Sequence, residues 1–136
     1  MIILNKILCG SSELFKNVPK FRPGDQDYII ISDSDKVFEH THPDEETCYF
    51  IWGKDKAMVR RYLLEFPYYM CLMSLVTKEF VDHYELTLKD IKKAVEQTRK
   101  VYETSTYRYY IPLFDYIIST GSWEFPKEII NESYEL

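Results

Sequence analysis

The first third of the chain alternates between short apolar runs and polar turns, which is the pattern of strands in a small sheet. Residues 2–9 are rich in Ile and Leu, and residues 25–32 contain a continuous Tyr-Ile-Ile-Ile run that is typical of an inner strand. A third run, residues 47–52, ends at Gly53. We therefore predict three strands within residues 1–53.

Two segments between these strands carry weaker signals. Gly10 and Ser11 follow the first run, and the serines and Glu13 after them favour the start of a short helix. Val37 and Phe38 predict either a short strand or a loop, and the polar residues 40–46 predict a loop. The sheet is thus expected to contain three or four strands.

The pattern changes to a helical period after Gly53. Thr87 to Asp90 resembles a capping box that opens a helix, and Gly121 is a typical helix stop. The predicted helices are residues 55–64, residues 68–83 as one strongly apolar helix, a helix opening at Thr87, residues 107–118, and a last short helix within 125–134.

This order of elements predicts an α+β (α/β-like) fold, in which a small mixed sheet packs against a C-terminal helical half. No linker rich in Pro or Gly divides the chain. We therefore expect residues 1–136 to form one domain, with residues 1–53 as the sheet core and residues 54–136 as the helical half.

Composition narrows the class of protein. Hydrophobic residues make up 46% of the chain, which is ample for a packed core. The net charge of −5 argues against nonspecific DNA binding, because such binding depends on Lys and Arg that neutralise phosphates. The 12 tyrosines, each with an apolar ring and a polar hydroxyl, can serve both the core and a surface that binds a partner.

The cysteines and the apolar runs bear on location. Cys9, Cys48 and Cys71 lie on apolar segments without CxxC spacing, which predicts reduced core residues. No segment has the form of a signal peptide, and the longest apolar run contains Glu65 and Pro67. We therefore expect a cytoplasmic protein that does not enter the membrane.

One pair of motifs suggests a specific chemistry. The first strand ends in Gly10-Ser11, and Asp25-x-Asp27 stands at the head of the second strand. Two carboxylates at i and i+2 of a strand point to the same face, roughly 6–7 Å apart at the backbone. Both can then reach one divalent metal or a metal pair. The alternative interpretation is a turn whose acids are merely solvated.

In order and strand context, these motifs resemble the signature of the DNA polymerase β-like nucleotidyltransferase superfamily. The resemblance covers about residues 3–52. It implies that Asp25 and Asp27 hold Mg²⁺ or Mn²⁺, and that a nucleoside monophosphate passes from a nucleoside triphosphate to an acceptor such as a protein or an RNA.

The resemblance also assigns residues around the metal. Gly10, Ser11 and Ser12 are expected at the triphosphate, and Lys20 and Arg22 at its phosphates. Members of the superfamily usually carry a third carboxylate on the third strand, where this chain has none. Glu46, just before that strand, is the candidate for both the third catalytic acid and the third metal ligand. A second departure is that many small members of the superfamily have an Arg after Gly-Ser, where this chain has Ser12.

These departures support a second hypothesis, in which the chain keeps the fold without the chemistry. It would then be a protein-interaction module, antitoxin-like or an accessory protein of a phage or mobile element, and its Tyr-rich helical face would bind a protein partner.

Three further groups of residues are candidate sites. His40 and His42 would face one way on a strand, and the carboxylates of Asp44, Glu45 and Glu46 could complete a metal shell. Because no third His or Cys lies at ligand spacing, we favour a solvated loop. The cysteines lack neighbours in sequence that would activate a thiolate, which argues against a thiol nucleophile. Tyr107 to Tyr110 could stack a base with Arg108 at a phosphate, although helix packing is the more common role.

Overall fold

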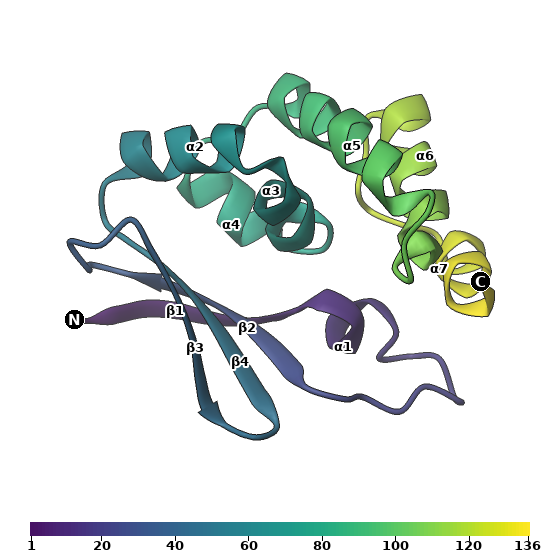
Figure 1. The fold of residues 1–136 in the computed structure, drawn as a ribbon, viewed down its shortest axis with the longest axis horizontal. Coiled ribbons are helices and arrows are strands. Elements are labelled where there is room, and N and C mark those ends of the chain that lie inside the picture. Colours follow the sequence, from purple (N-terminus) through teal and green to yellow (C-terminus); the bar gives the residue numbers. More distant parts are fainter.

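The computed structural model describes residues 1–136 and shows a four-stranded mixed sheet at the N-terminus with a helical C-terminal half (Figure 1). The strands are β1 (Ile3–Cys9), β2 (Gln26–Ser32), β3 (Phe38–Asp44) and β4 (Thr47–Trp52), in the order β1-β2-β4-β3. β2 and β4 run parallel in the centre, and β1 and β3 pair with them antiparallel. The predicted α+β class is confirmed.

The loop predicted over residues 40–46 is wrong, because most of that segment forms β3. The segment reads as polar because β3 is an edge strand, where most side chains are exposed and charged or polar residues discourage further pairing. Its apolar anchor is Phe38, whose ring lies 4.3 Å from that of Trp52 between centroids.

The helical half begins after Gly53 and follows the predicted order, with two differences. Its elements are α2 (Lys56–Glu65), α3 (Pro67–Ser74), α4 (Lys78–His83), α5 (Leu88–Tyr102), a 3₁₀ turn (Arg108–Tyr110), α6 (Ile111–Thr120) and α7 (Lys127–Glu135). The short helix predicted after Gly10 is α1 (Gly10–Leu14).

The two differences have local causes. The single helix expected over residues 68–83 is divided into α3 and α4, and the hydroxyls of Ser74 and Thr77 bond to the carbonyls of Met70 and Met73 at the break. Such back-bonding bends or interrupts helices. The segment from Tyr107 begins as a 3₁₀ turn, and regular helix starts only at Ile111, next to Pro112, which fits the first turn.

The helix boundaries marked by Thr87 and Gly121 are confirmed, whereas α1 lacks the expected serine cap, because it begins at Gly10 and its N-cap residue is Cys9. The Thr87 hydroxyl accepts a hydrogen bond from the Asp90 N–H at 3.1 Å, and Asp55 caps α2 in the same way through Met58. Gly121 ends α6 with a left-handed φ of 73°. At the start of α2, the start of α5 and the end of α6, a short polar or flexible residue satisfies the helix end.

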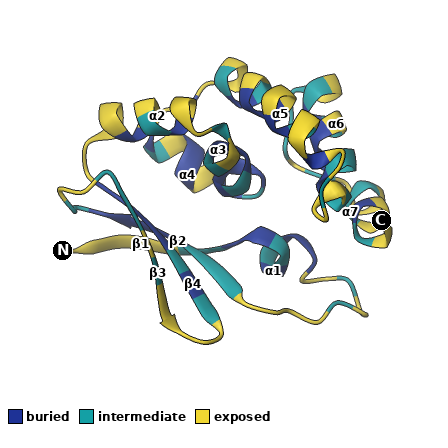
Figure 2. Ribbon diagram, in the orientation of Figure 1, coloured by how far each residue is buried: buried dark blue, intermediate teal, exposed yellow.

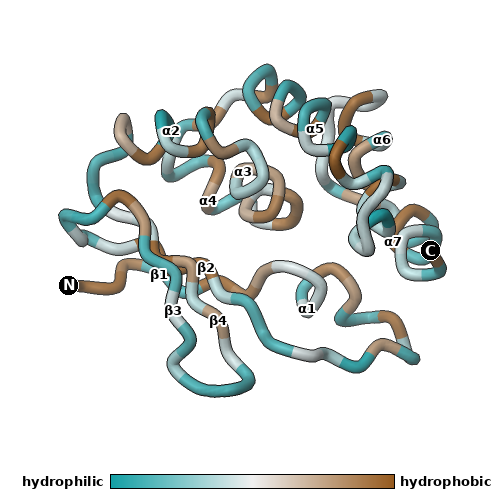
Figure 3. The backbone as a smooth tube through the Cα atoms, in the orientation of Figure 1, coloured by the Kyte–Doolittle hydropathy of each residue, from teal (hydrophilic) through white to brown (hydrophobic).

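The helices cover one face of the sheet and enclose the core (Figures 1 and 2). The fully buried Trp52 of β4 packs on Phe80 of α4, with ring centroids 5.5 Å apart. The Tyr84 hydroxyl after α4 donates to the Gly53 carbonyl at 2.9 Å. The apolar N-terminal residues, which form the brown chain end in Figure 3, remain exposed. No helix is both long and apolar enough to cross a bilayer.

We predict that Gly53→Ala destabilises the fold by about 3 kcal/mol, because overpacking against immobile backbone is costly. A Cβ at Gly53 would lie 2.0 Å from the Lys36 carbonyl oxygen. Gly24→Ala is the matched control, since a Cβ there meets nothing within 4 Å. Urea denaturation followed by circular dichroism measures both. Equal stability of the two variants would contradict the close approach at Gly53.

Candidate functional site

The two halves of the Gly-Ser and Asp-x-Asp motif lie against each other. Cys9 at the end of β1 pairs with Asp27 of β2, so Gly10 turns directly over the Asp27 side chain. Gly10 has a left-handed φ of 66°, and a Cβ there would lie 2.7 Å from Asp27 Oδ2. Glycine is therefore required both by the backbone conformation and by the carboxylate that fills this space.

Asp27 is partly buried and Asp25, at the head of β2, is exposed. Burial raises the pKa of Asp27, and the Asp25 charge acts in the same direction, whereas a hydrogen bond from Cys48 and the nearby His40 and His42 oppose the rise. Neither aspartate takes part in an ion pair. Two adjacent carboxylates outside any Lys or Arg ion pair form an environment that favours a cation.

The backbone of Glu46 lies close to the Asp25 and Asp27 segment, but its side chain does not join their carboxylates. Its carbonyl accepts a hydrogen bond from the Gln26 N–H at 2.8 Å, which ties the turn before β4 to the head of β2. The Glu46 side chain is exposed, and Asp25, Asp27 and Glu46 do not form a group whose carboxylates converge within 4.8 Å. Its role as third acid stays a prediction.

The residues expected at the phosphates separate into two groups. A cavity of about 310 Å³ brings together Ser11, Arg22 and Gly24, and its aromatic walls are Phe15, Phe21, Tyr109 and Tyr134. Lys20 is exposed and does not line it. Ser12 is buried, and its hydroxyl has no hydrogen-bond partner. Ser11 and Arg22 therefore share one cavity, which Ser12 and Lys20 do not line.

Arg22 and Tyr109 give this cavity its chemical character. The Arg22 guanidinium is exposed and bonds only to backbone carbonyls, those of Pro19 at 3.2 Å and Phe21 at 3.0 Å. It is therefore free of any carboxylate. Tyr109 comes from the 3₁₀ turn before α6, so the helical half contributes an aromatic ring to a cavity that begins at the Gly10 turn.

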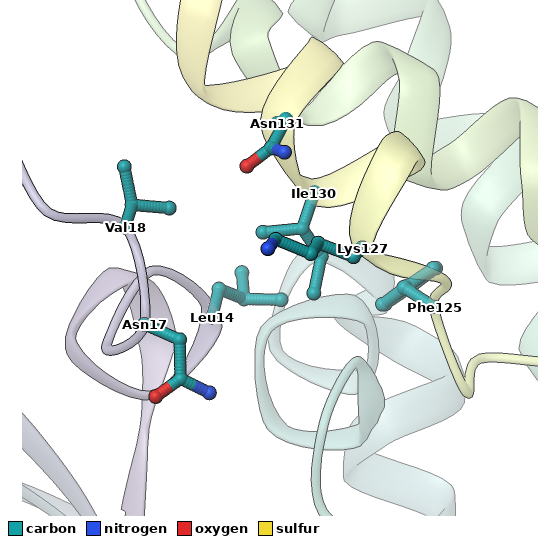
Figure 4. Close-up of a pocket in the computed structure, with 7 residues that line it drawn as sticks. All are labelled: Leu14, Asn17, Val18, Phe125, Lys127, Ile130 and Asn131. Carbon is teal, nitrogen blue, oxygen red and sulfur yellow. The ribbon is translucent and has the colours of Figure 1, made fainter.

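A second cavity, of about 450 Å³, lies between α1 and α7 (Figure 4). Leu14 and Ile130 meet across it, and Lys127 is the only charged residue in its wall. None of the predicted site residues lines this cavity. It lacks the acid and base groups that a reaction centre needs, so its size alone does not make it the site.

Sequence reasoning missed a cluster formed by His40, His42 and Cys48. The Nε2 atom of His40 lies 2.6 Å from the Cys48 Sγ, and one donor atom from each of the three residues falls within 4.8 Å of the others. β3 pairs antiparallel with β4, and His40 stands opposite Phe50, so this register brings both imidazoles to Cys48. The alternation of His40 and His42 is visible in the sequence, but treating residues 40–46 as a loop hid the pairing with β4 that brings Cys48 to them.

The cluster borders the aspartate pair. Asp27 and Cys48 are register partners on the parallel strands β2 and β4. Burial raises the pKa of the Cys48 thiol to about 11, and the Asp27 charge contributes to the rise. A contact between His40 and Cys48 thus exists, yet the neighbouring carboxylate disfavours a free thiolate, which argues against a thiol nucleophile.

Comparisons of the chain with protein-family models, curated proteins and solved structures found no match. The assignment of a function therefore depends on the site itself.

We predict that Gly10→Ala destabilises the protein by about 1–2 kcal/mol in the native background, because an L-residue is strained in the left-handed region. Part of the cost should come from the Asp27 carboxylate. In an Asp27→Ala background, where that oxygen is absent, the same substitution should cost less. Denaturant titration of the four proteins of this double-mutant cycle gives the coupling. An identical cost in both backgrounds would show that Asp27 does not occupy the space over Gly10.

Proposed function

We propose that the protein is a metal-dependent nucleotidyltransferase that transfers a nucleoside monophosphate from a nucleoside triphosphate to an acceptor group. The observation that carries the proposal is the juxtaposition at the end of β1. The Gly10 turn packs on Asp27, and the cavity beside it combines Ser11, an unpaired arginine and tyrosine rings. A triphosphate, its metal and its base need these groups together.

The cation would be held by Asp25 and Asp27. Both are without an ion-pair partner, and hard carboxylate oxygens are the ligands that Mg²⁺ and Mn²⁺ prefer. The bound metal would neutralise charge on the phosphate oxygens. Asp27 supplies the more rigid carboxylate, because β1 and β4 flank it on both sides.

The remaining roles belong to side chains of the cavity. The Ser11 hydroxyl can donate a hydrogen bond to a phosphate oxygen, and the Arg22 guanidinium can bind one through two N–H groups. Tyr109 and Tyr134, which contribute rings from the helical half, can stack on a base. We expect the acceptor to approach from the solvent side of Asp25, which is the exposed member of the pair.

A second candidate function is that of an interaction module, and one surface feature favours it. A cavity of about 240 Å³ lies between α3 and α5, and Phe66, Tyr68 and Val101 at its rim are exposed apolar residues. Together with Tyr107, they form part of a Tyr-rich helical face suited to a protein partner. The exposed Glu46, which does not complete a carboxylate triad, is also consistent with this function.

We predict that the protein binds a nucleoside triphosphate in the presence of Mg²⁺, and that Asp25→Asn/Asp27→Asn weakens binding at least about tenfold, because each charge-assisted contact contributes about 1.5–3 kcal/mol. Isothermal titration calorimetry with each common triphosphate measures the affinity. Asp33→Asn/Asp35→Asn is the matched control, since it removes two aspartates of the same spacing from the turn at the other end of β2.

A second pair of variants separates the cavity from general surface charge. Arg22→Ala should weaken triphosphate binding about tenfold, whereas Lys20→Ala should leave it within about twofold, because only Arg22 lines the cavity. Equal affinities for the wild type and the Asp25→Asn/Asp27→Asn variant would overturn the proposal. Nucleotide-independent capture of a protein partner that depends on Tyr68 would favour the interaction module instead.

A further inference from the structure

We propose that His40, His42 and Cys48 form a second metal site, which binds a transition-metal dication of the Zn²⁺ type. The three donor atoms lie within 4.8 Å of one another, on the paired strands β3 and β4. This inference does not rest on the proposed nucleotidyl transfer, because the Mg²⁺ of that reaction would be held by carboxylates.

The backbone already holds the ligands near the required geometry. In a tetrahedral Zn²⁺ site the bonds to sulfur and nitrogen are about 2.0–2.3 Å, so the donors stand roughly 3.3–3.8 Å apart. His40 and Cys48 already approach within 2.6 Å, so they must move slightly apart as an ion enters between them. His42 is exposed and can rotate toward the ion.

Aromatic packing orients the first ligand. The His40 ring stacks on Phe50 of β4 with centroids 4.6 Å apart and planes 9° from parallel. The His42 ring follows at 4.9 Å from His40. Phe50 therefore supports His40 from within the sheet, and such support of a ligand by a neighbouring group strengthens metal binding.

The donor types and the surrounding charge select the metal. Two imidazoles and one sulfur suit Zn²⁺ and related ions, whereas Mg²⁺ prefers oxygen ligands. The Asp27 carboxylate lies beside Cys48 on the paired strands, and Asp25 adds a second negative charge nearby. A dication at the sulfur would compensate a thiolate beside these carboxylates, which no Lys or Arg pairs with.

The site has an open position. Both histidines are exposed, so solvent reaches the cluster. Asp27 borders it through Cys48 but is not part of the three-residue group. We therefore infer three protein ligands with water in the fourth position, which is the arrangement of reactive zinc sites rather than of closed structural ones. Asp27 would accept a hydrogen bond from that water.

Cobalt provides a direct readout, because Co²⁺ occupies zinc sites and its spectrum reports the ligands. The full-length protein is stripped with a chelator, dialysed and titrated with CoCl₂. We expect one ion per chain, the visible bands of a tetrahedral ion, and a near-ultraviolet band from thiolate coordination. Addition of ZnCl₂ should displace the cobalt and remove these bands.

Single variants assign the ligands. His40→Ala and His42→Ala should each weaken metal binding at least about tenfold, by analogy with the effect of losing groups that only support a ligand. Cys48→Ser should remove the near-ultraviolet band. His83→Ala and Cys71→Ser are the matched controls. His83 is the remaining histidine of the chain, and Cys71 is a buried cysteine of the helical half that contacts Thr98 at 3.4 Å. Both controls should bind as the wild type does.

Three results would overturn the proposed metal site. They are the absence of stoichiometric Co²⁺ binding, a cobalt spectrum without the near-ultraviolet thiolate band, and a loss of metal affinity in His83→Ala equal to that in His40→Ala. Circular dichroism checks folding, and if Cys48→Ser is unfolded, the two exposed histidines still carry the test. Asp27→Asn should keep the thiolate band while weakening Mg²⁺-dependent triphosphate binding. The failure of one proposal is thereby distinguished from the failure of the other.

Discussion

Asp27 of β2 lies beside Cys48 of β4 because the two central strands are parallel and in register. On the other side, Asp27 faces Cys9, and the chain turns at Gly10 immediately above it. The Asp27 carboxylate thus lies between the Gly10 turn on one side and the β3–β4 hairpin on the other. Both candidate sites lie at this end of the sheet: the nucleotide site needs the Asp27 carboxylate, and the His40, His42 and Cys48 cluster borders it through Cys48.

Packing at the opposite ends of β2 and β4 holds Asp27 and its neighbours in place. β2 and β4 end in the core, where Ile31 and Trp52 are buried beneath α3 and α4. Gly53 then lets the chain leave the sheet close to the Lys36 backbone. Because the apolar ends of the strands are fixed against the helices, their beginnings can present Asp25 and Asp27 to solvent, while Cys48 beside them lies at the edge of the core cluster. Stability and chemistry are therefore divided along the length of each strand.

Local signals were sufficient for much of the fold. Thr87 and Gly121 mark helix ends by side-chain chemistry and backbone freedom, and both boundaries were predictable. β3 was not, because an edge strand with exposed His, Asp and Glu has the composition of a loop and is defined only by its partner β4. The division between α3 and α4 was also hidden, since it depends on where the Ser74 and Thr77 hydroxyls bond.

The same limit applies to the sites. The order of Gly10-Ser11 and Asp25-x-Asp27 predicted that these residues belong together, and the antiparallel pairing of β1 and β2 places Gly10 on Asp27. The His40, His42 and Cys48 group could not be found from spacing, because it exists only once β3 pairs with β4. The Arg22 cavity likewise needs Tyr109 and Tyr134, which come from the far end of the chain.

The central claim is that the Asp27 end of the sheet is a nucleotide-binding metal centre. Anomalous scattering from crystals grown with Mn²⁺ and a non-hydrolysable nucleoside triphosphate tests it most directly. The account predicts a manganese peak bonded to Asp25 and Asp27, with phosphate density beside Ser11 and Arg22. A nucleotide seated elsewhere, or crystals that show neither manganese nor phosphate at Asp27, would contradict it.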